Sequence, residues 1–592
     1  MSDKYAPRTW APDERPTMPG GPSFPAHSNP RRAAYFLVGT LVTLTGGLGN
    51  ALVSANLVNL QGTLGAYAYE TNWLPAAYVM TNASMNLVLV KFRQQFGLRA
   101  FTEAFLVLYA LVTFAHLFVN DIGSAIAVRA AHGMVGAALS TLGLYYTLQA
   151  FTKAWRPRGI VISTGISQLA LPLAYLFSSS LLQIAEWRGL YVFELGLTLV
   201  TLGAVLWLKL PPGDRFKAFR PADFLTFILF APGVALLTAA LTFGRVLWWT
   251  EQRWIGVALA ASIVLILAAI CVERNRQNPL LNIRWLTNGS IVRLAIAMML
   301  VRVVLSEQSV GAVGFLRLVG LNNDQLQVLF AVVLVATILG IVFAALAVRR
   351  ADLLTPQIVA LLIMAVGAYI DAQADNLTRP AQMMVSQGML AFGGVLFLGP
   401  LLLTLMGSVI ANPANLISFS VLFSLTQNMG GLLGSSLLGT FQVMREKYHS
   451  SLLAESLSSL DPLVAGRIQQ GAAAYARVLA DPAARSRQGA AALAASATRE
   501  ANILAYNDVF LLIAVLAVLL AVWIFGRGMW VKYIAPPTEA PGAAARPSPA
   551  APLEMPRPTD SPLATPSGDR RGDTRPPQPV APGEPMPQAA NP

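Results

Sequence analysis

The chain has 592 residues, of which 55% are hydrophobic and only 12% charged, and its mean hydropathy is +0.56. A soluble domain carries about a quarter of its residues as charged side chains, so this composition excludes a soluble globular protein for most of the chain. The single cysteine, Cys271, excludes an internal disulfide, and no cluster of cysteine and histidine offers a metal site.

The apolar residues gather into about fourteen stretches, each long enough to cross a lipid bilayer as a helix. A hydrocarbon core of about 30 Å needs roughly 20 apolar residues in helical form. The stretches lie near residues 35–60, 72–90, 101–119, 123–149, 159–182, 189–210, 223–243, 254–272, 290–316, 325–348, 355–372, 381–406, 414–443 and 507–531. An even number of spans places both termini on the same side of the membrane.

The net charge of +13 indicates membrane orientation rather than nucleic-acid binding, because the basic residues lie in the short connections between the apolar stretches. Lysine and arginine are retained in cytoplasmic connections. The connections on the side of the N-terminus carry Lys91, Arg93, Arg99, Lys153, Arg156, Arg158, Lys209, Arg215, Lys217, Arg220, Arg274, Arg276, Arg284, Arg349 and Arg350. The opposite short connections carry only Arg188, Arg245, Arg253, Arg317 and Arg379. We therefore expect a multi-pass protein of a bacterial inner membrane with both termini in the cytoplasm.

Two terminal segments and one connection differ in composition from the spans. Residues 1–30 and the Pro/Ala-rich residues 535–592 lack apolar periodicity, so we expect both to be disordered cytoplasmic tails. The connection at residues 444–506 contains two Asp-Pro pairs, Asp461-Pro462 and Asp481-Pro482, each of which favours the start of a helix. We expect three amphipathic helical pieces that form an extracytoplasmic hairpin, serving either as a lid or as a docking site for a partner protein.

A few ionisable side chains far from the ends of the predicted spans are the candidates for transport and proton coupling: Arg129, His132, Glu194, Arg302 and Glu307. A charge at the bilayer centre costs roughly 3 kcal/mol or more, so each should face the bundle interior or water. His132 shares a helix face with Arg129 and can titrate near neutral pH. The alternative for Arg129 is a structural role in binding neighbouring carbonyls. Glu103 and Asp371 lie near the ends of their spans, where we expect them to be solvated.

Uncharged polar side chains within the spans are candidates for a substrate path. They are Asn56, Asn59, Asn82 and Gln168. Amides at lipid depth either join helices by hydrogen bonds or line a polar passage, and the sequence leaves both alternatives open.

Several short motifs resemble those of the major facilitator superfamily. Residues 129–137, RAAHGMVGA, resemble its R-x-x-Q-G-x-G-A motif, and residues 73–78, WLPAAY, are similar to the W-x-x-x-x-Y of its fourteen-span drug:proton antiporters, the EmrB/QacA type. Residues 187–191, 427–434 and 505–510 have counterparts in that family too. The resemblance implies an all-α major facilitator fold: a six-helix bundle at residues 31–212, a two-helix insertion at 213–285 and a second six-helix bundle at 286–534.

The connection after the second span, residues 90–99, looks like a degraded form of the superfamily's gating loop. The residues that match it are Lys91, Arg93, Gly97 and Arg99, and the loop lacks the family's aspartate. The first span likewise reads Leu48-Gly49-Asn50-Ala51 where members usually carry an aspartate. The antiporter motif of the fifth span is reduced to Gly165 and Pro172.

The resemblance implies a proton-coupled antiporter that exports hydrophobic or amphipathic small molecules by alternating access. It also implies a periplasmic adaptor protein and an outer-membrane channel as partners through the 444–506 hairpin. Two other hypotheses remain open: an importer or exchanger of a specific metabolite, and a transport-inactive membrane scaffold or sensor. We expect no enzymatic activity and no cofactor, because the sequence has no phosphate-binding loop, nucleophile elbow or metal-binding helix motif.

Overall fold

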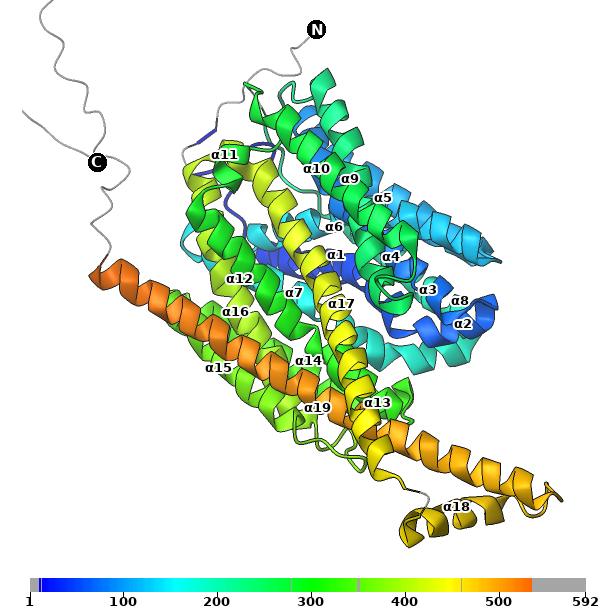
Figure 1. Ribbon diagram of the computed structural model, residues 1–592. Helices are drawn as coiled ribbons and strands as arrows, with labels where there is room; N and C mark the ends of the chain where they lie inside the picture. Colours follow the sequence, from blue (N-terminus) through cyan, green and yellow to red (C-terminus); the bar gives the residue numbers. More distant parts are fainter. Residues whose placement is uncertain (1–9, 12, 278, 349–351, 459, 535–592) are drawn as a thin grey trace, which may run out of the picture. The chain divides into compact units, whose positions relative to one another are not determined.

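The computed structural model describes residues 10–11, 13–277, 279–348, 352–458 and 460–534, which contain helices and no strand (Figure 1). Within those residues, thirteen helices are long and apolar enough to cross a membrane. The remaining predicted span is the 24-residue helix α4 (Trp73–Phe96), which is more polar because it carries Asn82, Asn86 and Lys91. The prediction of an all-helical membrane protein with about fourteen spans is thereby confirmed.

The first six spans lie in helices α1 (Asn29–Ala55), α4, α5 (Leu98–Ala115), α6 (Ile122–Gln149), α7 (Arg156–Gln168) and α8 (Ala170–Trp207). The fifth span ends at Ser178 and the sixth begins at Trp187, both within α8. Helix α1 packs on α6 and α8, and α4 packs on α6. The contact between α4 and α6 depends on Gly133, because a Cβ atom there would overlap the main-chain carbonyl of Tyr78. The short helices α2 (Leu57–Leu64) and α3 (Ala68–Thr71) connect α1 to α4.

The last six spans lie in α12 (Gly289–Leu305), α14 (Asn323–Ala347), α15 (Leu354–Asp371), α16 (Met384–Ala411), α17 (Leu416–Ser456) and α19 (Pro482–Tyr533). Both α14 and α15 pack on α16, α12 packs on α17, and α19 packs on α15 and α17. The span that begins with α12 continues through a π-helical segment, η3 (Glu307–Ala312), into α13 (Val313–Leu318). We call the two groups of six spans the first half and the second half.

Helices α9 (Pro221–Val246) and α10 (Arg253–Arg274) lie between the two halves in the sequence. Helix α9 packs on α10, on α4 of the first half and on α17 of the second half. The α9/α10 contact includes a hydrogen bond of 2.7 Å from the Ser262 hydroxyl to the Gly233 carbonyl. The short helix α11 (Ile283–Leu286) leads from α10 into α12. The inserted pair therefore contacts both halves.

A helical hairpin interrupts the second half between its last two spans. Helices α17 and α19 extend beyond the bundle, and α18 (Pro462–Ala474) packs on α19 between them (Figure 1). The Asp461 carboxylate accepts a hydrogen bond from the Leu463 amide (2.8 Å), and that of Asp481 accepts one from the Ala483 amide (3.0 Å). These caps begin α18 and α19 at the two predicted Asp-Pro pairs. The expected three helical pieces are present.

We call the side of the bundle where α1 begins the terminal side, and the opposite side, from which the hairpin projects, the hairpin side. The sequence predicted that residues 1–30 are disordered. This prediction is wrong for the described part of the segment, which packs on the terminal side of the bundle. Met18 and Phe24 are buried, the Ser23 amide donates to the Pro212 carbonyl (3.1 Å), and the Gln149 amide donates to the Ser23 carbonyl (3.0 Å). These contacts satisfy main-chain groups that a free tail leaves to water, which is why the segment is held. Residues 1–9, 12 and 535–592 lie outside the described residues.

Candidate functional site

Arg129 lies fully buried in α6, in the interior of the first half. Its Nη1 atom donates to the Gly49 carbonyl (2.9 Å) and its Nη2 atom to Oδ1 of Asn50 (2.8 Å). The guanidinium carbon lies 4.8 Å from the centre of the Tyr78 ring. Arg129 is thus bound by the amide of Asn50, in the part of the first span that the sequence comparison of motifs singled out.

His132 joins Arg129 to Glu194. Nη1 of Arg129 lies 3.1 Å from Nδ1 of His132, and because a guanidinium only donates, Nδ1 accepts and the ring proton of a neutral imidazole is on Nε2. That Nε2 atom lies 2.8 Å from Oε1 of Glu194 on α8, and the Tyr109 hydroxyl donates to the same oxygen (2.8 Å). The positive charge of Arg129 and the negative charge of Glu194 therefore balance across one imidazole.

The structure brings together three of the five predicted ionisable residues in this cluster, and it adds neighbours that the sequence reading missed. The His116 ring centre lies 5.0 Å from that of His132, and Tyr109 also donates to the Thr45 carbonyl (3.1 Å). Neither residue stands out in the sequence, because nothing in the motif around either one indicates a partner on α6 or α8. Glu307 and Arg302 lie elsewhere.

Glu307 belongs to a second buried cluster, inside the second half. It is the first residue of η3 and is 0% exposed. The Gln387 side-chain amide, on α16, donates to both carboxylate oxygens of Glu307 (3.0 Å each) and to Oδ2 of Asp371 (2.8 Å). The Ser386 hydroxyl donates to the other oxygen of Asp371 (2.5 Å). Two carboxyl groups from α15 and η3 thus share one amide.

The expectation that Asp371 is a solvated helix end is wrong, because only 3% of the residue is exposed. It is the last residue of α15, but α16 packs along that end and supplies Ser386 and Gln387. The polar pair at the start of the twelfth span was the signal in the sequence that could have indicated a buried partner. Glu103, in contrast, keeps 43% of its side chain exposed, 3.7 Å from Lys209, as expected of a solvated end.

Arg302 lies at the contact between the halves. Its Nη1 atom, on α12, lies 3.5 Å from Oε1 of Gln168 on α7, and its Nε atom has no hydrogen-bond partner among the described residues. No carboxylate of the described residues lies within 4.0 Å of it.

Asn82, another predicted path residue, accepts a long hydrogen bond from Asn428 of the second half (3.4 Å) and donates to the Gly133 carbonyl (3.3 Å).

The other two predicted path residues lie at the hairpin side. Asn56 is buried, and its amide donates to the Ser178 hydroxyl (2.7 Å) while its oxygen accepts from Asn323 of the second half (3.2 Å). Asn59 is exposed and lines, together with Asn56 and Arg317, a cavity of about 470 Å³. Asn56 joins helices across the two halves, and Asn59 faces open space.

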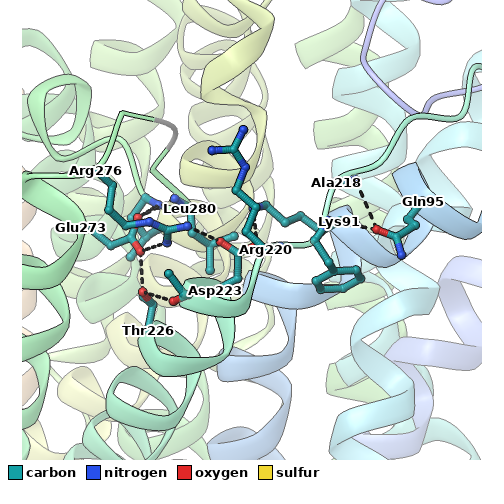
Figure 2. Close-up of polar contacts among 12 residues, drawn as sticks. Lys91, Gln95, Ala218, Arg220, Asp223, Thr226, Glu273, Arg276 and Leu280 are labelled. Atoms are coloured by element: carbon teal, nitrogen blue, oxygen red, sulfur yellow. Dashed lines mark hydrogen bonds and ion pairs between the residues drawn. The ribbon is translucent and has the colours of Figure 1, made fainter.

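The predicted gating loop is mostly helical, because α4 continues to Phe96, and its residue Lys91 binds the inserted helix pair (Figure 2). Nζ of Lys91 lies 2.5 Å from Oδ2 of Asp223 on α9, and Nη2 of Arg276 lies 2.7 Å from the other oxygen. Glu273 binds Arg276, Thr226 and the main-chain amide of Leu281 (3.1 Å). Lys91 of the predicted loop therefore pairs with a carboxylate of α9.

The remaining loop residues have structural contacts. Arg93 is buried and its guanidinium carbon lies 4.8 Å from the centre of the Tyr145 ring. Gly97 ends α4 with φ +90°, a conformation that favours glycine. Arg99 is exposed, and its Nε atom lies 3.5 Å from the Leu210 carbonyl oxygen.

Comparison with known proteins points to a single superfamily. No protein-family model matches the chain. A major facilitator superfamily multidrug transporter of Aspergillus fumigatus, mfsC, is 24% identical over 41% of this chain and 46% of its own length. An uncharacterised transporter of the same superfamily from Bacillus subtilis, YhcA, is 22% identical over 71% of this chain and 80% of its own length. A lincomycin resistance protein of Streptomyces lincolnensis is 26% identical over 39% of this chain and 48% of its own length.

The chain is similar in sequence to transporters of the major facilitator superfamily. Among solved structures, the proton:xylose symporter XylE has the same fold, with a TM-score of 0.50, 14% identity and coverage of 86% of this chain and 97% of that one. A bacterial homologue of the human drug peptide transporters PepT1 and PepT2 has a TM-score of 0.50, 12% identity and coverage of 85% and 100%. The chain spans somewhat less than half the length of the first relatives that it matches, so their substrates do not define its substrate.

Proposed function

We propose that this major facilitator protein is a proton-coupled antiporter that exports hydrophobic or amphipathic small molecules by alternating access between its two halves. The observation that carries the proposal is the buried pair Glu307 and Asp371, which share the Gln387 amide. The relatives named as multidrug and efflux transporters support the direction of transport.

The buried pair is suited to bind and release protons because its charge is not compensated. Among the described residues, no lysine, arginine or histidine forms an ion pair with either carboxyl group. An isolated carboxylate is very costly in such surroundings, and two neighbouring carboxylates disfavour each other further, so at least one of the pair holds a proton. The single Gln387 amide can supply hydrogen bonds to both carboxyl groups only while one of the two groups is protonated.

Alternating access requires that the halves separate on one side of the membrane at a time. At the hairpin side they are joined by polar and ring contacts, including the Arg317 guanidinium on the Ala55 carbonyl (3.1 Å) and a stacked Tyr175/Phe330 pair with ring centres 3.9 Å apart. Deeper in the bundle, Asn86 donates to the Ser424 hydroxyl (3.0 Å). Such contacts are individually weak and can be exchanged for water, which supports repeated opening.

The orientation that we propose places the terminal side in the cytoplasm and the hairpin side outside a bacterial inner membrane. It is supported by the excess of lysine and arginine in the terminal-side connections. In this orientation, the Arg129, His132 and Glu194 cluster is a second group that could take part in proton transfer, through the imidazole.

The test uses purified protein in vesicles, with a lipophilic dye supplied outside them in two separate assays, one with a cationic dye and one with an anionic dye. An imposed pH gradient should drive accumulation of the dye by the unaltered protein. Glu307→Gln should abolish gradient-driven accumulation while dye exchange without a gradient persists, because the substrate still binds but the proton does not. The control is Glu103→Gln, which removes an exposed carboxylate. Gradient-driven accumulation by a Glu307→Gln, Asp371→Asn double variant would contradict the proposal, and equal transport with and without a gradient would remove proton coupling altogether.

A further inference from the structure

We propose that Arg302 binds the acidic group of the substrate, and that the protein therefore accepts amphipathic organic anions. The inference rests on the proposed transport function and specifies its substrate class. It starts from the charge of Arg302, whose side chain makes one polar contact among the described residues, to Gln168 at 3.5 Å. Arg129, in contrast, has four acceptors, and Glu194 balances its charge.

The helices around Arg302 offer no carboxylate that could neutralise it. Helices α7 and α16 contain no acidic residue, and neither do α1 and α4 of the first half. The first acidic residue of α17 is Glu446, far along the helix toward the hairpin. Glu307 lies on the same span, but the Gln387 amide binds both its oxygens. A cation kept at this depth without an internal partner is costly unless an anion from outside reaches it.

The position of Arg302 also suits a substrate site, because it lies where the halves meet. Gln168 comes from the first half, and the facing surface of α17 carries Gly430 and Gly431, which have no side chains. A Cβ atom at Gly431 would lie 3.4 Å from Nη2 of Arg302, so the guanidinium faces a surface without side-chain bulk. Opening the halves at this contact would expose the guanidinium to a bound molecule from either side in turn.

The chemistry of the site selects the ligand. A guanidinium with free donors binds carboxylate, sulfonate or phosphate groups by paired hydrogen bonds, which are stronger than those between neutral groups. The amide of Gln168 carries no net charge, so it leaves the positive charge of Arg302 uncompensated. We therefore expect the site to favour an apolar compound with one anionic group over the same compound with a cationic group.

The experiment compares two fluorescent probes with the same apolar body, pyrene sulfonate and pyrenemethyl trimethylammonium. Binding to the purified full-length protein in detergent is measured by fluorescence anisotropy. We expect Arg302→Gln to weaken sulfonate binding by about tenfold or more, the loss of one charge-assisted contact, without weakening binding of the cation. Gln168→Glu should have the same effect, because it places a carboxylate beside Arg302. The control is Arg293→Gln, which removes a charge from the terminal-side end of the same helix.

Arg302→Gln removes the positive charge, whereas Gln168→Glu adds a negative charge beside it. If one of the two variants fails to fold, the other still tests the inference. Sulfonate affinity within about twofold of the unaltered protein in both variants would overturn the inference, as would an unaltered protein that binds the cation more tightly or binds neither probe. The outcome is separable from that of the proposed function. Arg302-dependent sulfonate binding without any gradient-driven transport would contradict proton coupling alone, and gradient-driven transport of the cationic dye with Arg302-independent binding would contradict the substrate class alone.

Discussion

Arg302 and Glu307 lie on the same span and carry opposite charges, yet they form no ion pair. Arg302 contacts Gln168 of the first half, whereas Glu307 is bound by Gln387 within the second half. The span therefore presents a positive charge to the contact between the halves and a carboxyl group to the interior of one half. Under the two proposals above, this separation would give a proton and an anionic substrate different binding sites on one continuous span.

The Gln387 amide should matter for both stability and proton binding. We expect Gln387→Leu to lower the free energy of unfolding by about 1–3 kcal/mol, because it leaves two buried carboxyl groups without their shared donor. Thermal unfolding in detergent measures the change, with Gln373→Leu, at an exposed position, as the control. An unchanged unfolding temperature would mean that water or another donor already satisfies the pair.

The cluster in the first half should behave as one charge-balanced unit. Arg129→Gln and Glu194→Gln should each destabilise the protein by about 3 kcal/mol or more, because each leaves a buried charge without its counterpart. The double variant should lose at least about 1 kcal/mol less than the sum. Unfolding of the four proteins forms a double-mutant cycle, and the exposed pair Glu103 and Lys209 provides a cycle with little expected coupling. Strict additivity at Arg129 and Glu194 would show that the imidazole does not couple them.

Asp223 should hold the inserted helix pair to the gating loop. Its carboxylate binds Lys91 and Arg276 and is 2% exposed. Asp223→Asn leaves two cations without their partner, so we expect faster amide hydrogen exchange in the connections at residues 90–99 and 273–282. Asp352→Asn, at an exposed helix start, serves as the control. Unchanged exchange in both connections would show that packing alone holds the pair.

Docking of the N-terminal segment should weaken in acid. Burial lowers the pKa of His27 from its ordinary value of 6.5, and Nε2 of His27 lies 2.9 Å from Oε1 of Gln149. The detached segment therefore binds a proton more readily, so docking is favoured above pH 6.5 and is lost as the pH falls below it. Limited proteolysis near residues 13–28 at about pH 7.5 and about pH 5.5 measures the effect. His27→Gln, which does not titrate, should remove the pH dependence, and an equal rate at both pH values in the unaltered protein would contradict it.

The hairpin should be separable from transport itself. The groove between its helices is lined by Leu453, Arg467 and Leu493 with other residues of the hairpin alone, and it shares no residue with the buried clusters. We expect deletion of residues 455–497 to leave transport in vesicles intact and to abolish drug resistance in cells, as predicted for docking of a periplasmic adaptor protein and an outer-membrane channel. Loss of transport in vesicles would indicate a lid instead.

The span pattern and the capped hairpin were readable from the sequence because each depends on local properties: apolar length and Asp-Pro capping. The pairing of Arg129 with His132 was also readable, since both lie on one face of one helix. The partner of Glu307 was not, because Asp371 and Gln387 approach it only through packing of α15 and α16. The partner of Lys91 was missed for the same reason, since Asp223 lies in a helix more than a hundred positions later in the chain.

The π-helical segment η3 has a consequence for the helix that follows it. A π turn contains one residue more than an α turn, so α13 is rotated by about 100° from where an uninterrupted α-helix would carry it. That offset aims Arg317 at the Ala55 carbonyl of the opposite half. If the extra residue were drawn out of the turn, we expect Arg317 to move away from its acceptor, so the winding of the turn beside Glu307 and this contact between the halves should change together.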